Sequence, residues 1–326
     1  MRNISNRDDK PKKSPEELVE KMKKRGIIFL LLPEEQAISY LAEENNYLRT
    51  ASYRKNYEKY QLGENKGKYL NLDFAYLREL SAIDMHLRRH LLTMCVDLEH
   101  AFKLKILNEI VLDPKDDGYD IVRQFLDTNE FVKNNIARQA GKFFTGNLVN
   151  KYFNIDVSDR RNPTIIDIDC PVWVLLEILT FGDFLSFYEF YCDLYQKPKI
   201  ERGVLNPVKD LRNACAHNNC LLTNLQQQKN TAPSKTISEF VSKIKDIGDE
   251  ERRKKLKSRP LFDITCLLYL QKECMPSDRF KGQLSRLNSF LEDRVILHND
   301  YFGSNLLIVS SYRFIKKMVD FLARDL

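Results

Sequence analysis

A helical pattern from Asn71 to Leu112 constrains the fold of this chain more than any other feature of its sequence. Apolar residues recur there at steps of three and four positions, which aligns them along one face of a helix. These residues are Leu77, Leu80, Ile83, Leu87, Leu91, Met94, Leu98 and Phe102. The pattern therefore predicts one long helix with a buried face.

The composition favours the same kind of fold. Glycine and proline, which both weaken helix interiors, number only 11 each among 326 residues. A hydrophobic content of 43% and a charged content of 30% are typical of soluble globular proteins with one large or two medium domains. The net charge of +6 is modest and permits nucleic-acid binding without requiring it. We predict an all-α fold.

Several helix boundaries can be predicted. Ser14 suits an N-cap, Pro15 suits the first helical position, and Gly26 suits a helix end. A second helix is expected in "PEEQAISYLAEENN". The apolar segment 170–195 predicts two core helices, or one helix bent at Gly182, and its Trp173 is expected to be buried.

The organisation of the chain is predicted in four parts. Residues 1–13 are expected to form a flexible tail, and residues 14–70 an N-terminal helical region. Residues 71–225 are expected to form the main helical domain, and residues 226–326 a C-terminal helical region of open role. The polar stretch "NLQQQKNTAPSK" resembles a linker near the start of this last part.

The cysteines and the termini indicate a cytoplasmic protein without a metal or cofactor. The seven cysteines are odd in number and include no C-x-x-C pair or zinc-ligand spacing, which favours reduced, buried thiols. The N-terminus is polar and does not resemble a signal peptide. The longest apolar run, from Ile27 to Leu32, is too short to span a bilayer, so no membrane association is expected.

The segment "PVKDLRNACAHNN" places an arginine and a histidine on one short predicted helix. Asn206 is expected to cap this helix and Pro207 to be its first residue, while Asn218 and Asn219 are expected to end it. Helical spacing divides its other residues into an apolar face and a polar face. The apolar face holds Val208, Leu211 and Cys215, and the polar face holds Asp210, Asn213 and His217.

Two interpretations of this segment stay open when it is considered alone. Arg212 and His217 diverge by about 140° on a regular helix, so they would need a bound group or a partner chain to act together. A chain with 22 Arg and 5 His is also expected to contain about one such spacing by chance. The segment is therefore either a catalytic pair or the polar edge of an ordinary helix.

The wider sequence resembles a known family. "LRNACAHNN" is similar to the R-polar-x3-H signature of HEPN-domain ribonucleases, with Asn213 at the polar position. Four further segments resemble, in order, the Abi-type abortive-infection proteins of the AbiD/AbiF group. They are "ELVEKMKKRGIIF", "EEQAISYLAEENNYLRTASYRKNY", "DLEHAFKLKI" and "EILTFGDFLSFY". The resemblance extends over residues 14–225.

This resemblance implies a HEPN-type helical bundle with N-terminal and C-terminal helical extensions, acting as an anti-phage RNase toxin. It also implies a homodimer whose two motif helices meet at a shared site, and control by a small non-coding RNA in some relatives. Arg212 would stabilise phosphate, His217 would act as general acid or base, and Asn213 would orient the imidazole or bind phosphate. Glu99 would pair with Arg212 or position it, and Asp210 is a weaker candidate for similar support.

The chemistry of RNA cleavage suits these residue types. The RNA 2′-OH is the nucleophile, so cleavage needs a base, an acid for the leaving oxygen and positive charge on the phosphorane. Histidine can serve as acid or base near neutral pH, and arginine clamps phosphate in bidentate fashion. A two-fold dimer would supply a second histidine. The scheme requires no metal.

A wider set of residues could contact RNA, because Tyr and Arg stack on bases and Lys and Arg meet phosphates. Each member could equally belong to a solvated surface. The set is Tyr47, Arg49, Tyr53, Arg54, Lys55, Arg88, Arg89, Arg252, Arg253, Lys254 and Lys255.

Three functional hypotheses remain. The first is a HEPN endoribonuclease toxin, and the second is a non-catalytic RNA-binding protein that forms a ribonucleoprotein with a small RNA. The third is a helical interaction or DNA-binding protein in which the motif arose by chance. Joint presence of Arg212, Asn213 and His217 favours the first over the second.

Overall fold

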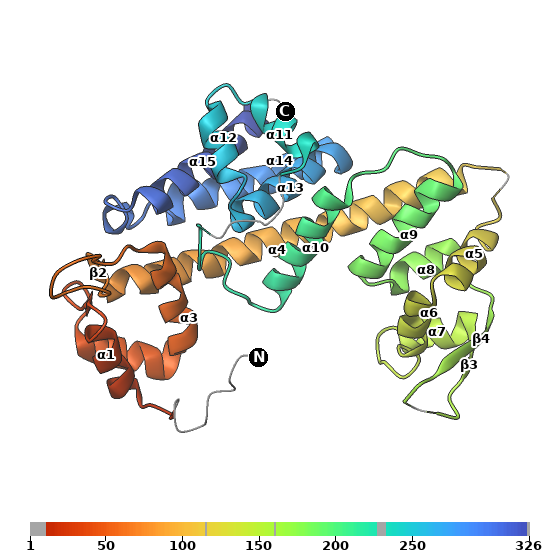
Figure 1. Cartoon of the computed structure of the whole chain (residues 1–326). Helices are drawn as coiled ribbons and strands as arrows, with labels where there is room; N and C mark the ends of the chain where they lie inside the picture. The colour runs from red at the N-terminus through yellow and green to blue at the C-terminus, as the bar shows by residue number, and fades with distance from the viewer. Residues whose placement is uncertain (1–10, 115, 160, 227–232, 325–326) are drawn as a thin grey trace. The chain divides into compact units, whose positions relative to one another are not determined.

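The computed structural model describes residues 11–114, 116–159, 161–226 and 233–324 (Figure 1). These residues form two compact units that alternate along the chain. The first unit comprises the described parts of Met1–Thr93, Leu211–Thr265 and Lys281–Leu326, and the second comprises those of Met94–Asp210 and Cys266–Phe280. Most of the predicted tail and half of the linker-like stretch lie outside the described residues, and the four-part division stays a prediction.

The first unit contains elements from the start of the chain and helices from its end. They are α1 (Pro15–Lys23), β1 (Ile27–Ile28), α2 (Glu34–Ser39), the π-helix η2 (Tyr40–Glu44), α3 (Tyr47–Ser52), the 3₁₀ helix η3 (Tyr53–Asn56), β2 (Leu72–Asp73), α11 (Lys235–Ser242), α12 (Asp249–Lys255), the π-helix η4 (Phe290–Arg294), the 3₁₀ helix η5 (Asn299–Tyr301) and α15 (Leu306–Arg324). Strands β1 and β2 pair in parallel over two residues each.

The second unit contains helices from the middle of the chain and one β-hairpin. They are α5 (Asp120–Thr128), α6 (Glu130–Ala137), α7 (Gly146–Tyr152), β3 (Phe153–Asp156), β4 (Thr164–Ile168), α8 (Val172–Ile178) and α9 (Phe181–Leu194). Four helices contribute residues to both units: α4 (Phe74–Val111), α10 (Arg202–Ala216), α13 (Arg259–Cys274) and α14 (Ser277–Ser289). Because the two strand pairs are short, the expected all-α fold is confirmed.

Helix α4 confirms the long helix that the apolar pattern predicts. All eight apolar residues of the pattern are buried, from fully buried Leu77 and Leu91 to Leu87, which is 7% exposed. Burying a side chain such as leucine contributes about 1.5–3 kcal/mol to folding. The apolar face of this helix is therefore a main source of stability for the residues around it.

The Asp73 carboxylate fixes the beginning of α4. Its Oδ1 accepts a hydrogen bond from the backbone N–H of Ala75 at 2.8 Å. Its Oδ2 accepts from the backbone N–H groups of Leu30 and Leu31 at 2.9 and 3.2 Å. The carboxylate thereby satisfies a helix N–H that lacks an intrahelical partner and anchors the loop that follows β1.

Local signals predicted the start of α1 correctly, whereas its end at Lys23 comes before the predicted end at Gly26. Ser14 caps the helix, and its side chain and that of Glu17 form a reciprocal capping box. Gly26 follows the helix with a φ of +82°, and a Cβ atom there would lie 2.7 Å from the Cβ of Lys68. Both the left-handed backbone and the close approach require glycine at this position.

The apolar segment 170–195 forms two helices, as one of the two predictions has it. The boundary between them lies before Gly182. Helix α8 ends at Ile178, and Thr180 caps α9 by accepting a hydrogen bond from the backbone N–H of Asp183. Gly182 lies inside α9, because a side-chain N-cap sets a helix start more strongly than one glycine disrupts a helix. Trp173 is 44% exposed, so its predicted burial is wrong.

The seven cysteines are all free thiols, five of them buried and two half-buried. No helix in the described ranges is long and apolar enough to cross a bilayer.

The buried face of α4 leads to a stability prediction. Replacing Leu91 with alanine removes a fully buried side chain and is expected to lower the free energy of unfolding by about 2–5 kcal/mol. Leu104→Ala on the same helix is the matched control, because Leu104 is 40% exposed and its loss is expected to cost under about 1 kcal/mol. Urea unfolding followed by circular dichroism measures both, and equal losses would contradict the assignment of the buried face.

Candidate active site

Helix α10 carries the arginine–histidine segment and begins earlier than predicted. It starts at Arg202, so Pro207 lies within the helix and Asn206 is not its cap. The backbone N–H groups of Val204 and Leu205 reach Glu201 O at 2.9 and 3.1 Å. Both side chains are buried, and this burial favours the extra helical turn although proline cannot donate a backbone hydrogen bond.

The end of α10 agrees with the prediction. Asn218 has a φ of 56°, in the left-handed region that ends many helices. The backbone N–H of Asn219 donates to Ala214 O at 2.8 Å, and that of His217 donates to Asn213 O at 2.9 Å. His217 therefore stands directly after the last helical residue, with its backbone held by the final turn.

The polar side chains of the motif lie on the accessible side of the helix end. His217 and Asn213 are exposed and Arg212 is half-buried, whereas Leu211 and Cys215 are each only 3% exposed. The Arg212 Nη1 donates to Asn213 Oδ1 at 3.3 Å. Asn213 thus contacts the guanidinium, and within the described residues its amide makes no hydrogen bond to the imidazole. Its expected role in binding phosphate stays a prediction.

The Asp84 carboxylate holds the segment that follows His217. This side chain lies on α4 and is fully buried. Its Oδ1 accepts hydrogen bonds from the backbone N–H groups of Leu221 and Leu222 at 3.0 and 2.9 Å. Its Oδ2 accepts from Tyr53 Oη at 2.8 Å and from Arg88 Nη1, its ion-pair partner one turn along the helix. Four donors from three parts of the first unit converge on one carboxylate.

Asn56 holds the same segment from η3. Its Nδ2 donates to Leu222 O at 2.7 Å, and its Oδ1 accepts from the backbone N–H of Leu225 at 2.8 Å. Its own carbonyl accepts from Asn305 Nδ2 at 3.0 Å. Residues 221–225, which we call the clamped segment, are therefore bound by two buried side chains immediately after the motif.

Burial dominates the electrostatics beneath the motif. It raises the pKa of the Asp84 carboxyl, while Arg88, Tyr53 and the two backbone N–H groups favour the ionised form. Burial also raises the pKa of the Cys215 thiol to about 12. Cys215 is therefore a packing residue rather than a nucleophile, because only the thiolate is strongly nucleophilic.

Glu99 lies in the second unit, whereas Arg212 lies in the first. The Glu99 carboxylate forms an ion pair with Lys103 at 3.1 Å, and both side chains are mostly buried. Its expected pairing with Arg212, and the supporting role of exposed Asp210, stay predictions.

The wider set of RNA-binding candidates divides by exposure. Lys55, Arg89, Arg253 and Lys254 are exposed, and Tyr47, Arg49, Arg54 and Arg252 are half-buried. Tyr53, Arg88 and Lys255 are buried, at 1%, 5% and 6% exposure. The structure therefore corrects the expectation that these three lie on a surface. Tyr53 and Arg88 instead serve the Asp84 cluster.

Sequence reasoning missed Asp84 and Asn56. Asp84 and Arg88 stand four residues apart within the apolar pattern of α4, which is the spacing of a helical ion pair. Charged residues on the apolar face of a helix are buried with that face. Because buried charges are rarely left unpaired, two such residues one turn apart indicate an ion pair. No such signal marks Asn56. Among the described residues, no cluster of His, Cys, Asp or Glu has the arrangement of a metal site.

A comparison with known protein families gives a match over much of the chain. A family model described as "Abi-like protein" matches residues 40–223, more than half of the chain. The matched range contains Tyr53, Asp84 and the whole arginine–histidine segment. Neither the curated proteins nor the solved structures contain a match to the chain.

The Asp84 cluster predicts a large effect of one substitution. Asp84→Asn keeps the shape of the side chain but leaves Arg88 buried without its counter-charge. We expect the free energy of unfolding to fall by about 3–5 kcal/mol. Asp127→Asn is the matched control, because the Asp127 side chain is 70% exposed and lies 4.0 Å from its lysine partner. Thermal unfolding compares the two variants, and a small shift for Asp84→Asn would contradict the role given to the cluster.

Proposed function

We propose that this chain, which belongs to the Abi-like protein family of abortive-infection proteins, is a HEPN endoribonuclease. The observation that carries the proposal is the placement of Arg212 and His217. They lie at the accessible end of α10, and two buried side chains bind the segment that follows. An exposed imidazole on an anchored backbone suits a catalytic group better than a residue that only completes a helix end.

The two side chains would divide the reaction as their chemistry allows. His217 would take the proton of the RNA 2′-OH or return one to the leaving 5′-oxygen, because imidazole titrates near neutral pH. Arg212 would stabilise the negative charge that develops on the phosphorane. The bond from phosphorus to the 5′-oxygen breaks as the bond to the 2′-oxygen forms, which leaves a 2′,3′-cyclic phosphate and a 5′-hydroxyl.

Asn213 supports the arginine in this scheme. Its Oδ1 accepts from Arg212 Nη1, which restricts the guanidinium, and its amide nitrogen remains able to donate to a phosphate oxygen. Glu99 would act as a positioning residue for Arg212, as the family resemblance implies. The scheme needs no metal ion.

The proposed partners follow from the same site. One chain has one motif histidine, whereas an acid and a base that act together require two histidines. We therefore propose a homodimer in which the two motif helices share one site. RNA is the substrate, and a small non-coding RNA would control the activity. Exposed Arg89 and Lys55 are further candidates to contact RNA phosphates.

A cleavage assay with His217→Ala tests the proposal. We expect the wild-type protein to cleave labelled RNA in excess chelator and to leave 2′,3′-cyclic phosphate ends. His217→Ala and Arg212→Ala should each lower the rate by about 100-fold or more. His100→Ala is the matched control, because His100 is also exposed and lies outside the motif.

Each alternative result has a definite meaning. Equal cleavage by the wild type and His217→Ala would remove His217 from the mechanism. Salt-sensitive RNA binding without cleavage, after any co-purified RNA is stripped, would instead support the non-catalytic RNA-binding protein.

The dimer makes a separate prediction. We expect light scattering to give twice the chain mass, and specific activity to fall when the protein is diluted below the dissociation constant of the dimer. A monomer with full activity at every concentration would contradict a shared site.

A further inference from the structure

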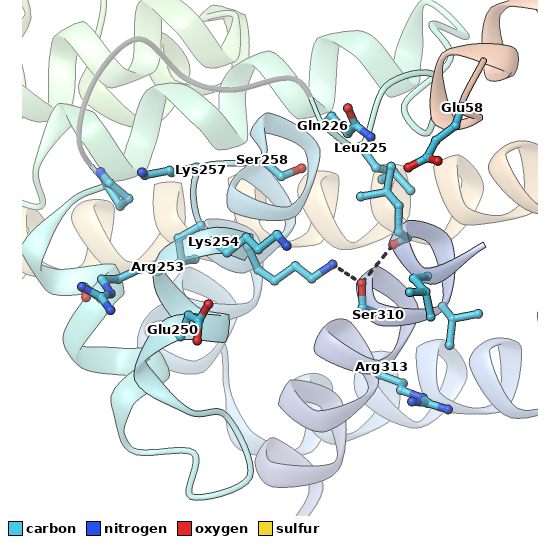
Figure 2. Close-up of a pocket in the computed structure, with 17 residues that line it drawn as sticks. Glu58, Leu225, Gln226, Glu250, Arg253, Lys254, Lys257, Ser258, Ser310 and Arg313 are labelled. Atoms are coloured by element: carbon cyan, nitrogen blue, oxygen red, sulfur yellow. Dashed lines mark hydrogen bonds between the residues drawn. The ribbon is translucent and has the colours of Figure 1, made fainter. Parts of the chain in front are cut away.

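A large cavity lies in the first unit, mostly after the part of the chain that the family model matches (Figure 2). Its volume is about 1120 Å³, slightly above the range of about 300–1,000 Å³ that is typical of small-molecule sites. Its walls come from α12, from residues 256–258, from α15 and from Leu225 of the clamped segment. The arginine–histidine motif does not line it.

The charge of the cavity wall is strongly positive. Five cationic side chains line it, namely Arg253, Lys254, Lys255, Lys257 and Arg313, against the carboxylates Glu58 and Glu250. Within the described ranges, none of the five forms an ion pair with a carboxylate. The nearby Glu251 is already bonded to Lys317 at 2.8 Å. This excess of positive charge fits an anionic ligand.

Lys255 is the most unusual of these cations, because it is only 6% exposed. Its Nζ donates to Ser310 Oγ at 2.6 Å and to Ser311 Oγ at 3.1 Å, which are both neutral acceptors. Burial and the neighbouring Lys254 lower the pKa of Lys255 to about 8. A buried ammonium without a bonded carboxylate is costly to keep, which is typical of functional sites.

Ser258 provides an independent observation on the same wall. It is 5% exposed, and its Oγ is buried without a hydrogen-bond partner. In Figure 2 the side chains of Lys254, Ser258 and Ser310 extend toward the same space. A buried hydroxyl that lacks a partner in the wall of a cationic cavity can donate to an external acceptor.

The cavity wall also has apolar side chains. They are Leu225, Pro233, Leu256, Leu306, Leu307 and Val309. A ligand that fits the whole cavity therefore combines a compact multiple negative charge with a flat or apolar group.

We propose that this cavity binds a nucleoside 5′-phosphate. The phosphate oxygens accept hydrogen bonds from Lys255, Lys254 and Ser258, and the base packs against the apolar side chains of the cavity. A free nucleotide and the 5′ end of an RNA present the same phosphate chemistry. The proposal concerns a second site and does not depend on His217.

The binding is expected to depend on pH. Lys255 donates to the phosphate as an ammonium, and the charged groups that act on it are Lys254 and Glu251, both on α12. The other charged side chains of the cavity wall are Glu58, Glu250, Arg253, Lys257 and Arg313. The protonated fraction of Lys255 in the empty protein falls as the pH rises through about 8. A phosphate group is doubly ionised above about pH 7, so the ligand does not change there. Affinity should therefore decline above pH 8, with proton uptake on binding.

Calorimetric titration of the full chain in chelator tests the site with ATP, tripolyphosphate and adenosine. We expect ATP and tripolyphosphate to bind, and adenosine to bind far more weakly. Lys255→Met should weaken ATP binding by about tenfold or more, as loss of a charge-assisted hydrogen bond implies. Lys235→Met is the matched control and should change affinity less than about twofold, because the Lys235 side chain is 87% exposed and does not line the cavity.

Additional variants and ligands distinguish loss of the site from unfolding. Lys254→Gln changes an exposed side chain, so its loss of affinity cannot reflect unfolding. His217→Ala should bind ATP as the wild type does, which separates this site from the proposed nuclease. A preference for RNA with a 5′-triphosphate over RNA with a 5′-hydroxyl, lost in Lys255→Met, would identify the RNA end as the source. Absence of ATP and tripolyphosphate binding, or unchanged binding in Lys255→Met, would overturn the proposal.

Discussion

The carboxylate of Asp84 is the interaction on which the candidate active site depends. It is fully buried on α4 and accepts hydrogen bonds from Arg88, Tyr53 and two backbone N–H groups of the clamped segment. A buried charge is tolerated only when its partners are all present, because a single missing donor leaves a desolvated group unsatisfied. The segment after His217 is therefore fixed by a cluster that is stable only when all of its hydrogen bonds are present. This property suits a segment that must hold an exposed catalytic side chain in one place.

Much of the architecture could be predicted because its causes are local. The apolar residues of α4 repeat at helical spacing, and their burial follows from that repeat alone. Ser14 and Asn218 mark helix boundaries through hydrogen bonds and backbone angles within a few residues of themselves. The predicted start of α10 at Pro207 failed because burial of Val204 and Leu205 depends on distant parts of the fold.

The candidate site was predictable only in part, for a related reason. Arg212 and His217 could be found because they share one short segment. The groups that anchor this segment are far away in sequence, since 137 residues separate Asp84 from Leu221 and 166 separate Asn56 from Leu222. The type of a residue also does not reveal whether it is buried, because a polar side chain can be buried when a hydrogen-bond or ion-pair partner is close in the fold. Tyr53 and Arg88 resembled a surface patch for this reason, although Asp84 holds both in the interior.

The buried Lys255 and the motif are connected through Asn56. The Asn56 side chain binds Leu222 and Leu225, and its carbonyl accepts from Asn305, which caps the start of α15 through the Ile308 N–H. Helix α15 carries the two serines that bind Lys255, and Leu225 lines the cavity. A ligand that contacts Leu225 therefore touches the clamped segment, which begins a few residues after His217. Coupling between two sites is reciprocal, so any effect of a cavity ligand on RNA affinity at the motif would be matched by an equal effect of RNA on the affinity of the cavity.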